Sequence, residues 1–258
     1  MRIDEIVFAM PQGEALDVDA ALGKLGPRVV DITVGFDLPA LRGSGGGPLI
    51  LVPVRRRPLA GLPTVVKRAM DVCASSILLA FLLPLMVVIA ALVKLDTPGP
   101  VLFRQQRFGI SKKPFKLLKF RSMHCTAGGD RTVPQARRHD PRVTRIGRFL
   151  RRTSLDELPQ LLNVLKGDMS LVGPRPHATL HDDQYAALIE GYAARHHVKP
   201  GITGWAQVHG WRGETDTLEK MQRRVEYDIY YINNWSLRLD FRIIFKTLAV
   251  VVGQRNAY

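Results

Sequence analysis

The most informative stretch of this sequence is Phe149–Pro176, which reads FLRRTSLDELPQLLNVLKGDMSLVGPRP. Two adjacent carboxylates, Asp156 and Glu157, follow a pair of arginines, and the stretch ends in a rigid Pro-Arg-Pro sequence. Transfer of a phosphoryl group from a diphosphate needs a carboxylate that acts as nucleophile or metal ligand, guanidinium groups that bind phosphate oxygens, and a fixed backbone around them. The residue types in this stretch therefore predict phosphate chemistry.

The same residues also fit a purely structural role, because Ser154-Leu155-Asp156-Glu157 matches a helix capping box. Pro159 argues against a helix that starts at Ser154, since a proline beyond the first turn leaves a carbonyl unpaired. A helix that starts nearer Asp156 places Pro159 within the first turn and puts the Asp156 carboxylate at the positive end of the helix dipole, which keeps it ionised. The residue types alone leave catalysis and capping as equal alternatives.

The positive charge of the chain is concentrated in one region. The net charge is +14, and the segment from Lys94 to Arg152 carries 16 lysines and arginines against three aspartates. A surface of this kind binds nucleic acid, an anionic bilayer or a diphosphate. The sequence contains no recognisable nucleic-acid-binding module. We therefore expect a membrane surface and a diphosphate substrate as partners, and no nucleic acid.

Length and cysteine content set broad limits on the class of protein. The 258 residues are enough for one large domain or two small ones. The two cysteines, Cys73 and Cys125, argue against a disulfide framework and fit a reducing environment that faces the cytosol. Residues Met1–Asp17 lack a basic segment followed by an apolar core, so we expect no secretory signal there.

An uncharged segment of 22 residues, Val72–Val93, precedes the basic region. At about 1.5 Å per residue, a straight helix of this length would just span a hydrocarbon core of ~30 Å. Pro84 lies near its middle, where it kinks or breaks a helix, and both flanks are basic, which places both ends on the cytoplasmic face. We predict a re-entrant helix–break–helix that enters the bilayer and returns. A buried core helix and an ordinary spanning helix are the alternatives.

The fold expected from these patterns is α/β (α+β), with a partial α/β N-terminal region and linker over residues 1–60 and a membrane-associated domain over residues 61–258. Short apolar or β-branched runs predict strands at Ile3–Met10, Val29–Val34, Leu49–Val54, Val101–Phe108 and Pro114–Arg121. Helical spacing predicts helices at Ala15–Leu25, Leu158–Lys166, Asp183–His196, Leu218–Asn233 and Leu237–Val252. The last of these is amphipathic, and it suits a membrane surface and the protein core equally well.

Five co-linear motifs carry a resemblance to a known family. They are Lys119–Met123, Arg151–Gln160, Gly167–Pro176, Pro200–Gln207 and Tyr227–Tyr231. Together they resemble the bacterial sugar transferases, the monotopic polyprenyl-phosphate phosphoglycosyl transferases of exopolysaccharide, capsule and O-antigen synthesis, which include the undecaprenyl-phosphate glucose and galactose phosphotransferases. The resemblance covers about residues 64–258.

This resemblance implies a specific reaction and site. The expected activity is transfer of a sugar 1-phosphate from a nucleotide diphosphate sugar, with UDP-hexose as the expected donor, to undecaprenyl phosphate with release of UMP. By analogy with the family, Asp156 is the nucleophile that forms a covalent aspartyl-phosphosugar intermediate, and Glu157 is catalytic and holds Mg²⁺. The residues expected to bind substrate are Lys119, Arg121, Arg151, Arg175 and Gln207.

The resemblance also implies a location, the cytoplasmic face of the bacterial inner membrane, and identifies Pro84 as the break in the membrane helix. Leu83 stands where the family frequently has a serine. Residues 1–60 resemble the end of a soluble α/β domain of larger relatives, and residues 61–258 resemble the transferase domain. A homodimer is left open. The alternative reading is a non-catalytic, membrane-associated scaffold of a polysaccharide assembly machine, which would have no need of both Asp156 and Glu157.

Overall fold

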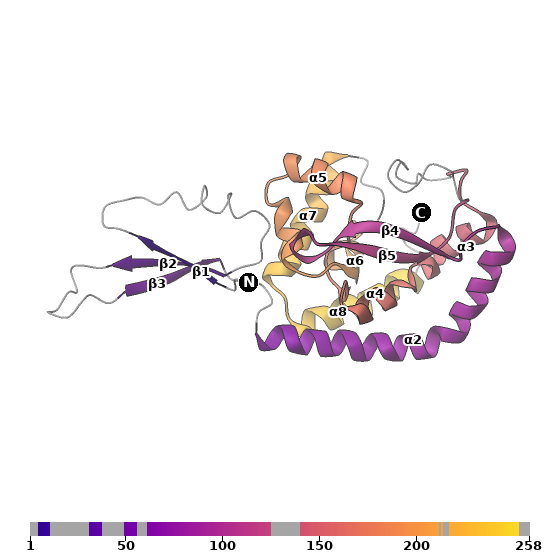
Figure 1. The fold of residues 1–258 in the computed structure, drawn as a ribbon, viewed down its shortest axis with the longest axis horizontal. Helices are drawn as coiled ribbons and strands as arrows, with labels where there is room; N and C mark the ends of the chain where they lie inside the picture. Colours follow the sequence, from indigo (N-terminus) through magenta and orange to yellow (C-terminus); the bar gives the residue numbers. More distant parts are fainter. Residues whose placement is uncertain are drawn as a thin grey trace.

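The computed structural model describes residues 5–10, 31–37, 49–55, 61–124, 140–211, 213 and 217–252. Over these residues the chain is a mixture of helices and three small sheets (Figure 1), as the α/β (α+β) prediction requires. The predicted helix at Ala15–Leu25 lies outside the described residues.

The first sheet contains the three predicted N-terminal strands. Strand β1 (Glu5–Met10) pairs in parallel with β2 (Asp31–Asp37), which pairs antiparallel with β3 (Leu49–Arg55). The β-branched runs therefore predicted these strands correctly, with boundaries that differ by up to three residues.

Helix α2 (Leu62–Asp96) is longer than the predicted apolar segment and is continuous through Pro84. The predicted break into two separate helices is wrong. A proline removes one backbone hydrogen bond, and the apolar residues on both sides of it continue the helix. Figure 1 shows that α2 runs along the lower side of the domain and then bends upward towards its C-terminal end, as expected for a helix that contains a proline.

One side of α2 packs on the domain and the other is exposed and apolar. Ile89 and Val93 are buried, and Leu79 and Leu82 pack against the main core. The helix is long and apolar enough to cross a membrane by length and composition, and in its most apolar 18-residue window only 17% of the residues are buried. The exposed large apolar side chains of α2 are those of Leu62, Val65, Val66, Ile77, Leu78, Phe81, Leu83, Leu85, Val87, Val88, Leu92 and Leu95.

A β-hairpin and two short helices form the centre of the domain. Strands β4 (Leu102–Phe108) and β5 (Pro114–Phe120) lie where the sequence predicted strands, and they pair antiparallel. Helix α3 (Arg145–Thr153) leads to α4 (Gln160–Lys166), which ends at Gly167 in the left-handed conformation. The predicted C-terminal stop of α4 is therefore confirmed.

The remaining elements cover the hairpin and α4. Strand β6 (Ser170–Val172) pairs in parallel with β7 (Gly201–Thr203), which is followed by the short helix α6 (Trp205–Val208). Helices α7 (Leu218–Asn233) and α8 (Leu237–Val252) have the predicted boundaries. The main core joins β5, α4, β6, α7 and α8 through Leu117, Leu161, Val164, Met169, Leu171, Val172, Val198, Tyr231, Ile232 and Ile243.

The predicted helix at Asp183–His196 is wrong. The structure has α5 (Thr179–Leu188), then Gly191 in the left-handed conformation with φ of 72°, then the 3-10 helix η4 (Tyr192–His197). Helix α5 ends at Leu188 because Ile189 is extended, with φ of −122° and ψ of 117°, and Gly191 then turns the chain into η4.

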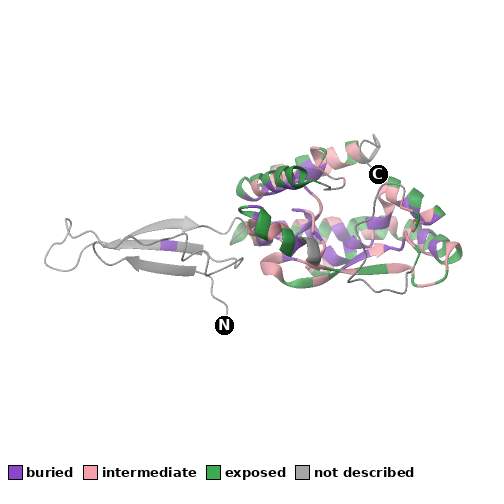
Figure 2. Ribbon diagram, turned by 90° about the horizontal axis from the view of Figure 1, so that it is seen from above, coloured by how far each residue is buried: buried purple, intermediate pink, exposed green. Residues whose placement is uncertain are grey.

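Helix α8 packs on the protein core, which is one of the two roles that the sequence allowed for it. Asp240 and Ile243 are fully buried, whereas Phe241, Phe245 and Leu248 are exposed. Figure 2 shows this alternation of buried and exposed residues along the helices of the domain. One face of α8 therefore packs on the core, and its other face exposes these apolar side chains together with Arg238 and Arg242.

Candidate active site

The two carboxylates lie in a tight turn between α3 and α4. Ser154, at the end of α3, has φ of 60° and ψ of 15°, and the following 3-10 turn η3 (Leu155–Glu157) carries Asp156 and Glu157. Ser154 makes no side-chain cap to this turn, so the capping box is not formed. Pro159 directly precedes the first residue of α4, where its missing N–H leaves no carbonyl unpaired.

Glu157 is held by two cations from separate segments. Its Oε1 accepts hydrogen bonds from Lys119 Nζ on β5 at 2.9 Å and from Arg175 Nη2 at 2.5 Å, and its Oε2 accepts one from Arg175 Nη1 at 3.2 Å. Arg175 belongs to the Pro-Arg-Pro sequence after β6. The arrangement is a bidentate pair with one guanidinium, completed by an ammonium group. The structure thus brings together three residues that the sequence proposed for the site from three different motifs.

Asp156 is buried, and its surroundings shift its pKa in opposite directions. Burial raises the pKa of the Asp156 carboxyl group, and the negative charge of Glu157 raises it further. The positive charges of Lys119, Arg151 and Arg175 oppose this shift. The sequence predicted an ionised Asp156 at a helix terminus, but the net direction of the pKa shift is upward, because burial penalises the charged form more than the cations favour it.

The loop that carries Arg175 is fixed by backbone-to-backbone packing. Gly173 N donates to Thr203 O at 2.9 Å, and Gly201 N donates to Pro174 O at 2.9 Å. A Cβ atom at Gly173 would meet Lys199 O, and one at Gly201 or Gly204 would meet the backbone of Gly173. These three positions must be glycine for the two segments to approach so closely. This contact explains why two of the motifs behind the family resemblance occur together.

Arg121 is buried away from solvent at the end of α2. Its guanidinium donates to Val93 O at 3.0 Å, Thr97 O at 2.5 Å and Pro98 O at 3.0 Å. These carbonyls belong to the C-terminal end of α2 and the residues after it, which a cation stabilises. Arg121, predicted to bind substrate, is thus placed as a cap on the C-terminal end of α2.

Gln207 is also buried, and it donates from Nε2 to Ile202 O at 3.2 Å. Its Oε1 has no hydrogen-bond partner in the structure. Arg151 lies in the last turn of α3, where its charge acts on Asp156. Of the five residues predicted to bind substrate, Lys119, Arg151 and Arg175 therefore act on the acidic dyad of Asp156 and Glu157, whereas Gln207 contacts strand β7.

Charged residues at the start of α2 have a role that the sequence did not reveal. Lys67 Nζ lies 2.7 Å from Asp240 Oδ2 on α8, and Arg68 donates to Val164 O at 2.5 Å and to Leu165 O at 2.7 Å on α4. Both cations had been interpreted as a basic flank for a membrane segment. They instead fasten α2 to the domain, and their partners lie about 100 to 170 residues away in the sequence.

The residues of the dyad fit a magnesium ion bound together with a substrate. Mg²⁺ takes oxygen ligands and is commonly held by one or two carboxylates plus phosphate oxygens. Within the part of the chain that the structure describes, no group of three or more His, Cys, Asp or Glu side chains is placed to hold a metal without such help. Two adjacent carboxylates supply the right donor type, and the remaining ligands would come from a diphosphate and water.

Comparison with known proteins identifies the family. The family model described as bacterial sugar transferase matches residues 62–254, and the chain belongs to this family. The matched residues include α2, the β4–β5 hairpin, the turn η3 with Asp156 and Glu157, and most of α7 and α8.

Curated relatives carry more specific names. The chain is 57% identical over 208 residues to the UDP-glucose:undecaprenyl-phosphate glucose-1-phosphate transferase of Escherichia coli, covering 81% of this chain and 45% of that protein. Proteins of the same name from Caulobacter vibrioides and Xanthomonas campestris pv. campestris are 51% and 44% identical. These two matches cover 92% and 100% of this chain, and 85% and 54% of the relatives. The chain thus spans about half the length of several curated relatives that it matches.

Proposed function

We propose that this chain transfers a sugar 1-phosphate from a UDP-sugar to undecaprenyl phosphate and releases UMP, with UDP-glucose as the first donor to test. The observation that carries the proposal is the buried pair of Asp156 and Glu157 surrounded by Lys119, Arg151 and Arg175. The names of the relatives support both UDP-glucose as the donor and undecaprenyl phosphate as the acceptor.

In the proposed first step, a carboxylate oxygen of Asp156 attacks the β-phosphorus of the UDP-sugar. A P–O bond forms to Asp156, the bond from the β-phosphorus to the oxygen that bridges the two phosphates breaks, and UMP leaves. An oxygen of undecaprenyl phosphate then attacks the same phosphorus, and the bond to Asp156 breaks. Both steps are in-line displacements at phosphorus, for which positioning and charge stabilisation supply most of the catalysis.

The surrounding residues have distinct roles in this proposal. Lys119 and Arg175 hold Glu157 in one orientation and place positive charge beside the phosphate oxygens. Arg151 and these two cations favour the ionised form of Asp156, which is the form that attacks. Mg²⁺ held by Glu157 would supply further neutralisation of the diphosphate charge.

We propose that α2 enters the membrane from one side and returns to the same side. Arg68 fastens the N-terminal part of α2 to α4, and Arg121, directly after β5, holds the C-terminal end of α2 through Val93 O and Pro98 O. Both ends of the apolar helix therefore contact one folded domain. An ordinary spanning helix would place them on opposite sides of a hydrocarbon core of ~30 Å. Because nucleotide sugars are cytosolic, we place the domain on the cytoplasmic face of the inner membrane.

The proposed activity is tested by incubating the purified protein in detergent with Mg²⁺, UDP-glucose and undecaprenyl phosphate, and measuring UMP. The expected result is release of UMP together with a lipid-linked glucose phosphate, with neither product from the Asp156→Asn variant. UDP-N-acetylgalactosamine serves as the comparison donor, since a relative from Aeromonas hydrophila is named for that sugar. Absence of UMP with each donor would contradict the proposal and favour a non-catalytic scaffold.

A further inference from the structure

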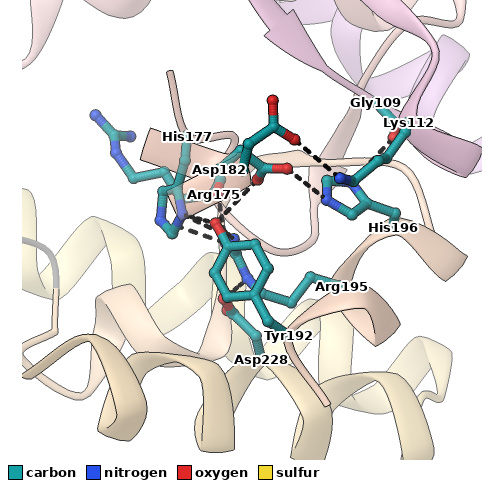
Figure 3. Close-up of polar contacts among 10 residues, drawn as sticks. Gly109, Lys112, Arg175, His177, Asp182, Tyr192, Arg195, His196 and Asp228 are labelled. Atoms are coloured by element: carbon teal, nitrogen blue, oxygen red, sulfur yellow. Dashed lines mark hydrogen bonds and ion pairs between the residues drawn. The ribbon is translucent and has the colours of Figure 1, made fainter. Parts of the chain in front are cut away.

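A buried network of polar side chains lies behind Arg175, centred on Arg195 in η4 (Figure 3). Arg195 Nε donates to Asp228 Oδ2 at 2.8 Å, and Nη1 donates to Tyr192 Oη at 3.1 Å. Its Nη2 donates to the backbone oxygen of Arg175 at 2.7 Å. The three nitrogens of one guanidinium thus join α7, η4 and the Pro-Arg-Pro segment.

The charge state of this network is well defined. Burial lowers the pKa of Arg195, but the charge and the hydrogen bond of Asp228, together with Tyr192 and Asp182, more than offset this effect. The net shift of the pKa is upward, and Arg195 is a cation. His177 has a pKa well below its ordinary value, because it is buried and lies among arginines, so it is neutral. Its Nδ1 lies 2.8 Å from Arg195 Nη1, which can only donate, so this nitrogen accepts. Arg195 therefore has acceptors on several sides that fix its orientation.

The far side of the network reaches the hairpin. Tyr192 Oη donates to Asp182 Oδ1 at 2.9 Å, and His196 Nε2 lies 2.9 Å from Asp182 Oδ2. The other ring nitrogen of His196 lies 3.3 Å from Gly109 O, just after β4. The network is therefore anchored on α5, α7 and the hairpin, and Arg195 is its contact with the Arg175 backbone.

We propose that Arg195, oriented by Asp228, is a positioning residue for Arg175. It holds the main chain of Arg175 from behind, while the guanidinium of Arg175 binds Glu157 on the other side. A continuous chain of contacts thus runs from Asp228 on α7 through Arg195 and Arg175 to the acidic dyad. This assigns a role to Asp228, which lies in the Tyr227–Tyr231 motif. The inference rests on the proposed function, because it takes the dyad as the reacting site.

The test is a double-mutant cycle between Arg195→Lys and Arg175→Lys. A lysine at position 195 keeps the charge but lacks the planar fork that reaches Asp228, Tyr192 and the Arg175 carbonyl together. In the wild-type background we expect kcat to fall by about 10- to 100-fold, because a displacement of about 1 Å in a catalytic site has an effect of this size. The KM for UDP-glucose should change much less.

The cycle separates positioning from general destabilisation. If Arg195 acts through Arg175, Arg195→Lys should lower kcat by less than about twofold in the Arg175→Lys background, since coupled residues are not additive. Equal losses in both backgrounds would overturn the proposal. Asp228→Asn, which keeps a side-chain acceptor, gives a second test with a smaller loss expected. Arg223→Lys is the matched control, because Arg223 lies exposed on the same helix α7, paired with Glu226, and should leave kcat unchanged.

One readout is independent of activity. In hydrogen exchange, Arg195→Lys should speed exchange in the peptide that covers residues 173–178, with the exchange of α2 unchanged. Unchanged exchange in that peptide would overturn the inference even if the wild type turns over substrate. A wild-type protein that releases no UMP would contradict the proposed function alone, and the exchange measurement would then decide the inference.

Discussion

Glu157 and Asp156 are adjacent in the sequence but differ in their surroundings. Both oxygens of Glu157 are engaged by Lys119 or Arg175. Asp156 is buried and has a raised pKa, and the cations around it act through their charge. In the proposed reaction, Glu157 is held in place and binds the cations and the metal. Asp156 is then the group that attacks the β-phosphorus of the donor.

The first prediction at the residue scale concerns Glu157→Gln. The amide cannot form the ion pairs with Lys119 and Arg175, and it is a weaker metal ligand than a carboxylate. We expect turnover to fall by orders of magnitude, measured as UMP release, and excess Mg²⁺ to restore it only partly. Full activity of the wild-type protein in EDTA would contradict a metal-dependent role for Glu157.

The second prediction concerns pH and Lys119→Gln. The positive charge of Lys119 lowers the pKa of Asp156, so its removal raises that pKa further. Because the ionised form attacks, activity is lost as the pH falls through this pKa, and the acid limb of kcat/KM should move to higher pH in the variant. Lys116→Gln, at an exposed position on the same strand, is the control and should leave the limb in place. A limb that stays in place or moves to lower pH in Lys119→Gln would refute this electrostatic role.

At the scale of the element, α2 is the segment in which the structure differs most from the prediction made from the sequence. The basic residues at its start form contacts within the domain, with Lys67 paired to buried Asp240 and Arg68 bound to carbonyls of α4. The helix continues through Pro84, and it bends towards its C-terminal end. The exposed apolar side chains of α2 and of α8 are the surfaces that we expect to meet lipid.

The topology prediction uses exposed positions at the two ends of α2. In a background with Cys73→Ser and Cys125→Ser, cysteines introduced by Thr64→Cys and Lys94→Cys, both at exposed positions, should react with an impermeant maleimide from the cytoplasmic face. Position 67 is unsuitable, because Lys67 is buried in an ion pair. Labelling of the two positions from opposite faces would favour an ordinary spanning helix.

The same assay tests the proline. Pro84→Ala restores the missing backbone N–H and removes the ring clash, so the helix should straighten. A straight helix is long enough to span the bilayer, but spanning would require the basic region after α2 to cross the hydrocarbon core, which is unfavourable. We expect mixed labelling and partial loss of activity. A variant with wild-type labelling and activity would show that the bend is not needed.

Sequence patterns correctly predicted the helices and strands that depend only on residues within the same segment. Helices α7 and α8, strands β4 and β5, and the stop at Gly167 were all predicted correctly. The roles of Lys67, Arg121 and Arg195 were not, because their partners lie far away in the sequence and only folding brings them together. A buried arginine and a substrate-binding arginine look the same in a sequence.

At the scale of the whole molecule, one domain combines an exposed apolar surface with a buried pair of carboxylates. Helix α2 is fastened at both ends, the glycines of two motifs fix the Pro-Arg-Pro segment, and a buried network supports Arg175. The proposed activity needs all three, because a water-soluble donor and a lipid acceptor must reach the same carboxylate.

The most direct test of this account is covalent labelling of Asp156 in the absence of the lipid acceptor. The purified protein is mixed with Mg²⁺ and UDP-glucose labelled in the sugar, and it is then analysed by intact and peptide mass spectrometry. The account predicts a glucose-phosphate adduct on the peptide that contains Asp156, loss of the adduct on addition of undecaprenyl phosphate, and no adduct on Asp156→Asn. Turnover by the wild-type protein without an adduct, or an equal adduct on the Asp156→Asn variant, would contradict it.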